Sequence, residues 1–266
     1  MHDLQGKYIA VNCWNSYFDH VSKMVLEHYD TEEYSNTVFV LGSYIFHPFN
    51  FFKDKYKNKK IIIYQMEQLF FSSDPLWHSV SKIIKRLKEA KNKGAEIWDM
   101  CSVNGAFLKQ NKIIVDKIAP LKFTESLKEL NLEAEPEIDL FFYGNINARR
   151  GKKLAELSYA FFHTGISVVS ASNLDINLQK KYMERSKIIL NIHGTDTFNR
   201  QEQPRIFYAL INKKCVLSEP SQKNYFERAI IESKDFLSSA QFLLKNDEYK
   251  EQARKGHEIF KSSIKH

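Results

Sequence analysis

The sequence contains no apolar run of about 18 residues, the length that a membrane-spanning helix needs. Its first residues, MHDLQGKYIAVNCW, lack the basic stretch, apolar core and small-residue cleavage site of a secretory signal peptide. Cysteine is scarce as well, because Cys13, Cys101 and Cys215 are the only three and lie far apart. We therefore expect reduced, buried cysteines in a cytoplasmic protein, without a disulfide framework.

Motifs that would indicate a metal or a dinucleotide are also missing. The sequence has no DxD motif and no cluster of His and Cys at metal-ligand spacing, so we expect no bound metal and no cofactor. No GxGxxG follows the first predicted strand of either half, which argues against an NAD-dependent enzyme. Hydrophobic residues make up 43% of the chain and aromatic residues 14%, which is enough to build cores and excludes a disordered chain.

The net charge of +7 favours anionic partners, such as a nucleotide diphosphate, nucleic acid or an anionic membrane face. A peripheral position at the inner face of a membrane therefore stays open beside the cytoplasmic assignment. Part of the surplus has a simpler interpretation as a solvated helix face. The lysines concerned recur at helical spacing: Lys82, Lys85, Lys88, Lys91 and Lys93.

Short apolar runs alternate with longer amphipathic stretches in the first half, which is typical of β–α units and a parallel sheet. The runs 37–43 and 60–65 are almost continuously apolar, as strands covered on both faces tend to be. The pattern predicts strands over 7–14, 37–43, 60–65, 95–100 and 112–118, with helices over 18–28 and 74–93 between them.

The second half repeats this alternation after the segment 121–137, which lacks a strong apolar run and which we interpret as a short helix and an interdomain linker. Strands are predicted over 138–143, 166–170, 187–192 and 214–218, and helices over 149–163, 176–185, 204–211 and the C-terminal part. We therefore predict an α/β protein with two Rossmann-like domains, 1–120 and 138–266, that face a cleft. In such folds ligands bind outside the carboxyl ends of the strands.

The first candidate site is the turn after the strand 138–143, which has the sequence YGNINARRGK. Gly144 permits close approach of the backbone, and the helix that follows offers free N–H groups at the positive end of its dipole. Asn145 lies in the polar turn, and Arg149 and Arg150 add donors that suit phosphate oxygens. A tight turn with exposed basic residues is the structural alternative.

Polar residues also end the next two strands of the second half. One strand runs into His193, and the helix after it begins with Glu202 just ahead of Arg205. Arg205 stands in a first helical turn, where a cation opposes the helix dipole and calls for an anionic partner. Glu219 ends the strand 214–218, where a carboxylate can accept hydrogen bonds from sugar hydroxyls. Helix caps and a surface salt bridge are the alternative interpretation.

The order and spacing of these elements carry a family resemblance. The segments IDLFFYGNINARR, SKIILNIHGTDTFNRQEQPRIFYALINKKCVLSE and IIIYQMEQL together resemble small bacterial and phage glycosyltransferases of the GT-B type. The chain is similar to glycosyltransferase-1-like C-terminal domains, including the CgeB-like spore-maturation group, most strongly over 138–219. The resemblance implies a GT-B fold and a UDP-linked sugar donor on the C-terminal domain. It also implies no metal requirement, since basic side chains and a helix N-terminus stabilise the departing diphosphate.

The resemblance also implies roles for individual residues. The diphosphate or its approach would be contacted by Gly144, Arg149 and Arg150. His193, Glu202 and Arg205 would line the donor site, and Glu219 would face the ribose or the sugar. One departure concerns the two glutamates, because the better-known GT-B families place two sugar- and ribose-binding glutamates closer together than Glu202 and Glu219.

The first half supplies candidates for the acceptor side. Glu67 follows the third predicted strand and Asp99 ends the fourth, so either is a candidate general base that deprotonates an acceptor hydroxyl. Asn104 is a candidate for orienting the acceptor. The alternative interpretation of each of the three is a loop-capping residue.

The resulting functional prediction is a hexosyltransferase whose acceptor hydroxyl belongs to a glycan, a protein, a lipid or a modified DNA base. The rival prediction is a non-catalytic, two-domain sensor that binds a nucleotide or another small ligand. Three arginines at helix starts favour the enzyme, because a sensor for a neutral ligand has no use for them. The chain is short for its class, which leaves a homodimer open.

Overall fold

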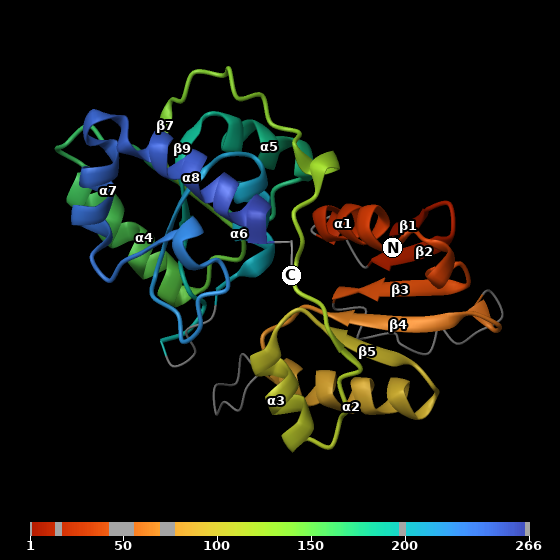
Figure 1. Cartoon of the computed structure of the whole chain (residues 1–266). Coiled ribbons are helices and arrows are strands. Elements are labelled where there is room, and N and C mark those ends of the chain that lie inside the picture. The colour runs from red at the N-terminus through yellow and green to blue at the C-terminus, as the bar shows by residue number, and fades with distance from the viewer. Residues whose placement is uncertain (1, 14–17, 43–55, 70–77, 197–200, 264–266) are drawn as a thin grey trace. The chain divides into compact units, whose positions relative to one another are not determined.

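The computed structural model describes the chain except for residues 1, 14–17, 43–55, 70–77, 197–200 and 264–266. The chain divides into two compact units, 1–122 and 123–266, shown in Figure 1. The segment 121–137, predicted as a linker, thus belongs to the second unit from Phe123 onward. None of the described helices is both long enough and apolar enough to cross a membrane.

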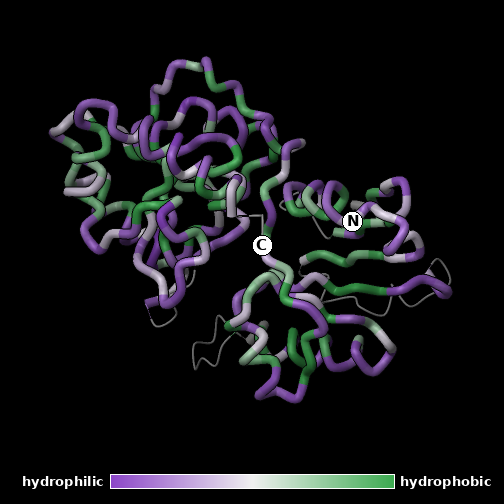
Figure 2. The backbone as a smooth tube through the Cα atoms, viewed as in Figure 1, coloured by the Kyte–Doolittle hydropathy of each residue, from purple (hydrophilic) through white to green (hydrophobic). Residues whose placement is uncertain are grey.

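The first unit is built on one six-stranded sheet in the order β1-β2-β3-β4-β5-β6. Strands β2 to β6 are parallel, and β1 pairs antiparallel with β2 at the edge. The strands are β1 His2–Gln5, β2 Ile9–Cys13, β3 Thr37–Leu41, β4 Lys60–Gln65, β5 Glu96–Asp99 and β6 Lys117–Ile118. Strands β2 and β3 are buried at every position, which explains their continuous apolar runs. Figure 2 shows the apolar character of β3 and β4.

The strand predicted over 112–118 is wrong in length, because only Lys117 and Ile118 pair with β5. The physical reason lies in Asp116. Its carboxylate accepts a hydrogen bond from the backbone N–H of Ile97 at 2.7 Å and forms an ion pair with Lys91 at 2.6 Å. The Asp116 N–H donates to Ile97 O at 2.8 Å, but its side chain, and not its backbone carbonyl, accepts from the Ile97 N–H, so the regular ladder begins at Lys117.

Helices cover both faces of this sheet: α1 Asp19–Tyr29 lies on one, and α2 His78–Asn92 and α3 Ser102–Gln110 on the other (Figure 1). The α2 face is packed by aliphatic side chains such as Ile83, Ile84 and Leu87. On the α1 face, Tyr29 meets the rings of Phe39 and Trp98 with centroids 5.5 and 5.3 Å apart. A short 3₁₀ turn, η2 Glu32–Tyr34, precedes β3. Helix α3 was not predicted.

The second unit has a five-stranded parallel sheet in the order β11-β10-β9-β7-β8. Its strands are β7 Ile138–Tyr143, β8 Val168–Ala171, β9 Ser186–Asn191, β10 Cys215–Ser218 and β11 Ile231–Glu232. The helices are α4 Ala148–Phe161, α5 Ile176–Glu184, α6 Gln203–Ile211, α7 Phe236–Leu244 and α8 Glu248–Ser262. Single 3₁₀ turns are η7 Glu125–Leu127, η8 Glu227–Ala229 and η9 Lys245–Asp247. The predicted strand 166–170 begins later, at Val168, and β11 interrupts the part predicted as wholly helical.

The strand order of the second unit reverses at one point, which fixes where a ligand belongs. The chain enters at β7, turns to β8 on one side, and then crosses to β9 and β10 on the other. A crevice opens at the carboxyl ends of the strands where such an order reverses. The topology therefore selects the loops after β7 and β9, and these carry the candidate residues from Gly144 to Arg150 and His193.

Candidate functional site

The turn after β7 is closed by Gly144 and a buried arginine. Gly144 has φ +127°, a conformation that L side chains rarely adopt, and a Cβ there would lie 2.5 Å from Arg205 Nη2. Arg205 is 3% exposed; its Nε donates to Tyr143 O at 2.9 Å and its Nη1 to Asn191 Oδ1 at 3.0 Å. Its guanidinium carbon lies 4.7 Å from the ring centroid of Phe142. Arg205 therefore ties the carboxyl ends of β7 and β9 together.

The N-terminus of α4 is fixed next to this turn by Asn147. The Asn147 side chain caps the helix by accepting from the backbone N–H of Arg150 at 3.0 Å. Its amide group donates to Gly194 O at 2.6 Å, in the loop after β9. The positive end of the α4 dipole is thereby held at the strand-order switch point.

Arg150 is the second buried arginine of the site, at 6% exposure. Its guanidinium donates to Ile192 O at 2.9 Å, to Asn145 O at 2.8 Å and to a Glu202 carboxylate oxygen at 2.7 Å. Glu202 stands at the N-cap of α6 but makes no capping bond with its side chain. Arg150 therefore joins the loops after β7 and β9 to the start of α6.

Arg149 is more accessible, with a side chain 22% exposed, and it binds Glu219 in a bidentate pair. Its Nη1 and Nη2 lie 2.9 Å from the two carboxylate oxygens, and its Nε donates to Asp196 at 2.5 Å. Lys153, one turn further along α4, places its ammonium 3.6 Å from Glu219. Two cations of one helix face thus converge on a single carboxylate.

Glu219 is ionised in this setting. Burial raises the pKa of Glu219, but the hydrogen bonds from Arg149 and from the His193 backbone N–H, the latter at 2.7 Å, outweigh it and hold the pKa below its ordinary value. The same pair raises the pKa of Arg149. The site therefore holds a fixed charge pair that an anionic ligand can reach through the partly exposed Arg149.

His193 is buried, at 2% exposure, beside this pair. Its Nε2 lies 3.1 Å from Pro220 O and 3.4 Å from Ser221 Oγ, contacts that place the proton on Nε2. Among the residues that the structure describes, its Nδ1 has no hydrogen-bond partner. A buried acceptor left unsatisfied costs about 1–3 kcal/mol, so Nδ1 has capacity for a donor from a bound molecule.

The candidates in the first unit form a separate network at the carboxyl ends of β4 and β5. Asp99 is fully buried, and its Oδ1 accepts from the Cys101 N–H at 2.7 Å and from Asn104 Nδ2 at 3.1 Å. The Asn104 side chain also accepts from the Leu69 N–H at 3.0 Å and donates to Glu67 O at 2.9 Å. These contacts are of the loop-capping kind. The Glu67 residue is half-buried, in contrast to Asp99.

The structure thus brings the eight predicted donor-side residues into one connected network and places the three acceptor-side candidates in the other unit. Sequence reasoning assigned no role to Asn147 and Asn191, although both stand in the candidate motifs, and it missed Lys153. Asn147 had a readable signal, because an Asn just before a helix start is a preferred N-cap. In the described part of the chain, no group of three His, Cys, Asp or Glu side chains is arranged to hold a metal ion.

No family model matches the sequence. No curated protein matches it either. The fold, in contrast, is similar to those of solved glycosyltransferases. A crystal structure of TarM aligns with a TM-score of 0.53 and 13% identity over 84% of this chain and 51% of that one.

Two further structures were solved with ligands. A mutant of S. aureus TarM in complex with fondaparinux, alpha-GlcNAc-glycerol and UDP aligns with a TM-score of 0.53 at 11% identity, over 87% of this chain and 54% of that one. T4 phage BGT in complex with its UDP-glucose substrate aligns with a TM-score of 0.52 at 14% identity, over 96% of this chain and 94% of that one. The chain spans about half the length of the TarM structures and nearly all of BGT. The predicted α/β class is confirmed, and the chain has a glycosyltransferase-like fold of the GT-B type.

Proposed function

We propose that this chain is a glycosyltransferase that moves a sugar from a UDP-linked donor to a hydroxyl acceptor without a metal. The observation that carries the proposal is the meeting of Arg149, Lys153 and the capped N-terminus of α4 at the switch point of the second sheet. The likeness of the fold to structures solved with UDP and with UDP-glucose supports the choice of donor.

Arg149 and Lys153 are the groups that bind the diphosphate. Both are partly exposed, both lie on one face of α4, and both are held by the same Glu219 carboxylate, so their positions are set before a ligand arrives. Negative charge grows on the diphosphate as the glycosidic bond breaks, and donors fixed in place before the reaction stabilise it. The dipole at the start of α4 acts in the same direction.

Arg150 and Arg205 act as positioning residues. Each is at least nine-tenths buried. Arg150 donates to backbone carbonyls of both switch-point loops, and Arg205 donates to Tyr143 O and Asn191 Oδ1 at the ends of β7 and β9. They hold Gly144, Asn145 and Glu202 in place, so their contribution to donor binding runs through the geometry of the loops. In this proposal, Arg149 is therefore the only one of the three arginines at helix starts that contacts the diphosphate directly.

Glu219 and His193 bind hydroxyl groups of the donor. The Glu219 carboxylate is ionised and accepts hydrogen bonds, and the unpartnered His193 Nδ1 supplies a second acceptor nearby. Ribose and sugar rings carry several hydroxyl donors, which match two acceptors close to a cation pair. The mixture of fixed acceptors and cations is what separates a nucleotide-sugar site from a simple phosphate site.

On the acceptor side, we assign the general base to Glu67 in preference to Asp99. A base must come within about 3 Å of the hydroxyl that it deprotonates. Asp99 is fully buried and engaged with Cys101 and Asn104, whereas Glu67 is half-buried at the end of the same loop network. Asn104 would then hold the Glu67 loop and contribute to acceptor binding indirectly.

The test begins with donor binding. UDP, GDP, ADP and CDP are compared by thermal shift, and UDP is expected to raise the melting temperature most, because a ligand of the folded state stabilises it. Arg149→Ala should weaken UDP binding roughly tenfold to a hundredfold, as expected for the loss of charge-assisted hydrogen bonds worth about 1.5–3 kcal/mol. Arg185→Ala is the matched control, since Arg185 forms an exposed ion pair with Glu137 in the same unit.

Turnover separates the enzyme from a binding module. Release of UDP from UDP-glucose is measured with and without candidate acceptors, and Glu67→Gln should abolish transfer while UDP binding persists. UDP binding without any release of UDP or transfer of sugar would favour the sensor. No shift with any nucleotide would contradict the whole proposal.

A further inference from the structure

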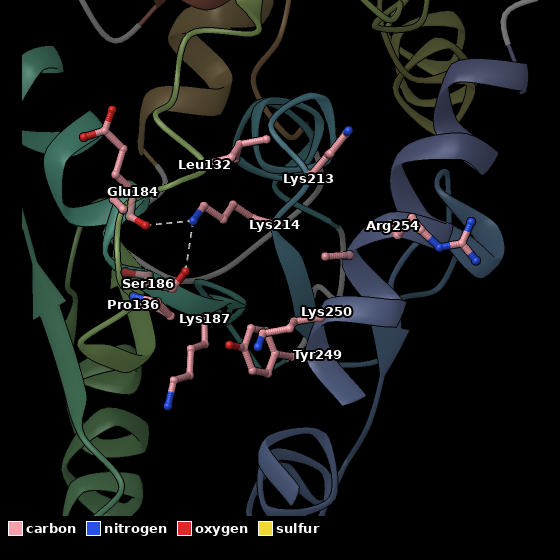
Figure 3. Close-up of a pocket in the computed structure, with 12 residues that line it drawn as sticks. Leu132, Pro136, Glu184, Ser186, Lys187, Lys213, Lys214, Tyr249, Lys250 and Arg254 are labelled. Atoms are coloured by element: carbon pink, nitrogen blue, oxygen red, sulfur yellow. Dashed lines mark hydrogen bonds between the residues drawn. The ribbon is translucent and has the colours of Figure 1, made fainter. Parts of the chain in front are cut away.

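A second concave site lies at the amino ends of the strands in the sheet of the second unit, in a pocket of about 280 Å³. It is bounded by the starts of β9 and β10, the end of α5, the first turns of α8 and the segment before β7 (Figure 3). The switch-point site lies at the carboxyl ends of β9 and β10. Five residue steps along β9 at about 3.3 Å each separate the two by roughly 17 Å. The pocket is therefore distinct from the donor site.

The pocket is rich in cations. Five Lys or Arg side chains line it against the single acid Glu184. Lys187, Lys250 and Arg254 each have a carboxylate partner, respectively Asp139, Asp247 and Glu251. In the described part of the chain, no such ion pair is formed by the other two, Lys213 and Lys214.

Lys214 is the more unusual of these two, because it is only 8% exposed. Its ammonium donates to the carbonyls of Glu184 and Ser186 at 2.9 and 3.2 Å, as Figure 3 shows. An ammonium has three N–H donors, so two carbonyls leave one of them over. The Glu184 carboxylate acts on this ammonium only through space, without a direct ion pair, although buried charges are normally paired.

The remaining wall is apolar and comes from Leu132, Pro136 and Tyr249. The volume falls just below the range of about 300–1,000 Å³ typical of small-molecule sites, which is too small for a whole nucleotide sugar. A phosphate monoester carries a charge of about −1.5 to −2 at neutral pH, which matches two lysines without ion-pair partners. A carboxylate or a sulfate ester supplies only one negative charge.

We propose that this pocket binds a small phosphate monoester, with Lys213 and Lys214 holding the phosphate and Leu132, Pro136 and Tyr249 holding an apolar body attached to it. The site does not depend on the glycosyltransferase proposal, since it shares no residue with the donor site. Lysine is well suited to the task as a compact point charge.

Calorimetric titration of the full chain with phenyl phosphate tests the proposal, alongside inorganic phosphate and phenyl sulfate. Phenyl phosphate should bind about tenfold more tightly than phenyl sulfate, which has the same shape and one charge less. It should also bind more tightly than inorganic phosphate, which lacks the apolar body. Equal affinities for phenyl phosphate and phenyl sulfate would overturn the charge-matching argument, and equal affinities for phenyl and inorganic phosphate would overturn the role of the apolar wall.

The chain offers a matched pair of variants. Lys213 and Lys112 are both exposed, both follow an Asn at the end of a helix, and both have positive φ, at +50° and +60°. Glycine relieves the same backbone strain at either position and removes the same charge. Lys213→Gly should weaken phenyl phosphate binding about tenfold, whereas Lys112→Gly should leave it unchanged. Equal affinities of Lys213→Gly and wild type would refute the site, and loss of binding in Arg149→Ala would place the ligand at the donor site instead.

Discussion

The close approach of Arg205 to Gly144 makes Gly144→Ala a demanding test of the site. A Cβ at this position would lie 2.5 Å from Arg205 Nη2, nearer than real Cβ contacts, so the guanidinium must move. Moving it weakens the bonds to Tyr143 O and Asn191 Oδ1, and a lost buried hydrogen bond costs about 1–3 kcal/mol. The positive φ adds about 1–2 kcal/mol for a residue with a Cβ. We expect a total loss of about 2–5 kcal/mol in the free energy of unfolding.

Gly165→Ala is the control for the part of the stability loss that comes from the positive φ angle. Gly165 also has positive φ, at +74°, but nothing lies within 4 Å of the position of its Cβ. This variant should lose only about 1–2 kcal/mol and keep UDP binding, whereas Gly144→Ala should lose UDP binding as well.

Urea unfolding followed by circular dichroism measures the loss, and tryptophan fluorescence supplies an internal reference. All three tryptophans, Trp14, Trp77 and Trp98, belong to the first unit, so their fluorescence reports its unfolding separately. The extra cost in Gly144→Ala should appear in the dichroism transition of the second unit. Equal stability of Gly144→Ala and Gly165→Ala would refute the reasoning.

Three further predictions concern buried polar side chains. Glu219→Gln should lower the free energy of unfolding by about 2–3 kcal/mol at neutral pH; because the folded-state pKa of Glu219 is depressed, this difference should shrink as the pH falls through that pKa, which unfolding at acid pH measures. Burial lowers the pKa of Lys214 from 10.5 to about 8. Below pH 8 Lys214 is therefore protonated in both the folded and the unfolded protein, and the folded protein carries the full cost of burying the charged ammonium. Between about pH 8 and 10.5 only the unfolded state keeps that proton, so the stability of the wild type relative to Lys214→Met should rise by up to about 3 kcal/mol; a flat difference would contradict the burial of this charge. Asp99→Ala should cost about 2–3 kcal/mol by removing the Oδ1 that accepts from the Cys101 N–H and from Asn104 Nδ2, and tryptophan fluorescence should detect the loss; an unchanged transition would show that these two contacts are dispensable.

The sequence was informative where hydrophobic runs were long and were followed by polar residues. Strands such as β3, β4, β7 and β9 were predicted close to their observed bounds, because each is buried on both faces. The short elements were not, since two-residue strands such as β6 and β11 carry no periodicity. The antiparallel edge strand β1 is four residues long and has no apolar run.

The site shows a different limit. The residues at the carboxyl ends of β7, β9 and β10 could be predicted, because parallel strands bring those ends to one edge. Their partners could not, because whether an arginine faces a ligand or a backbone carbonyl depends on where another loop passes. Arg149 and Arg150 are adjacent in the chain, yet one pairs with Glu219 and the other is buried among carbonyls of Ile192 and Asn145.

Helix α6 has a mechanical consequence. It is buried along its length except at Pro204, and at nine residues it is about 13 Å long. Arg205 stands in its first turn against Gly144, where not even a methyl group fits, and Lys213 and Lys214 follow its last turn. Because α6 is tightly packed and its first turn has no free space against Gly144, a displacement of its C-terminal end shifts its N-terminal end as well. Any sliding or tilting of α6 at its lysine end therefore has to be absorbed by the β7–β9 switch point.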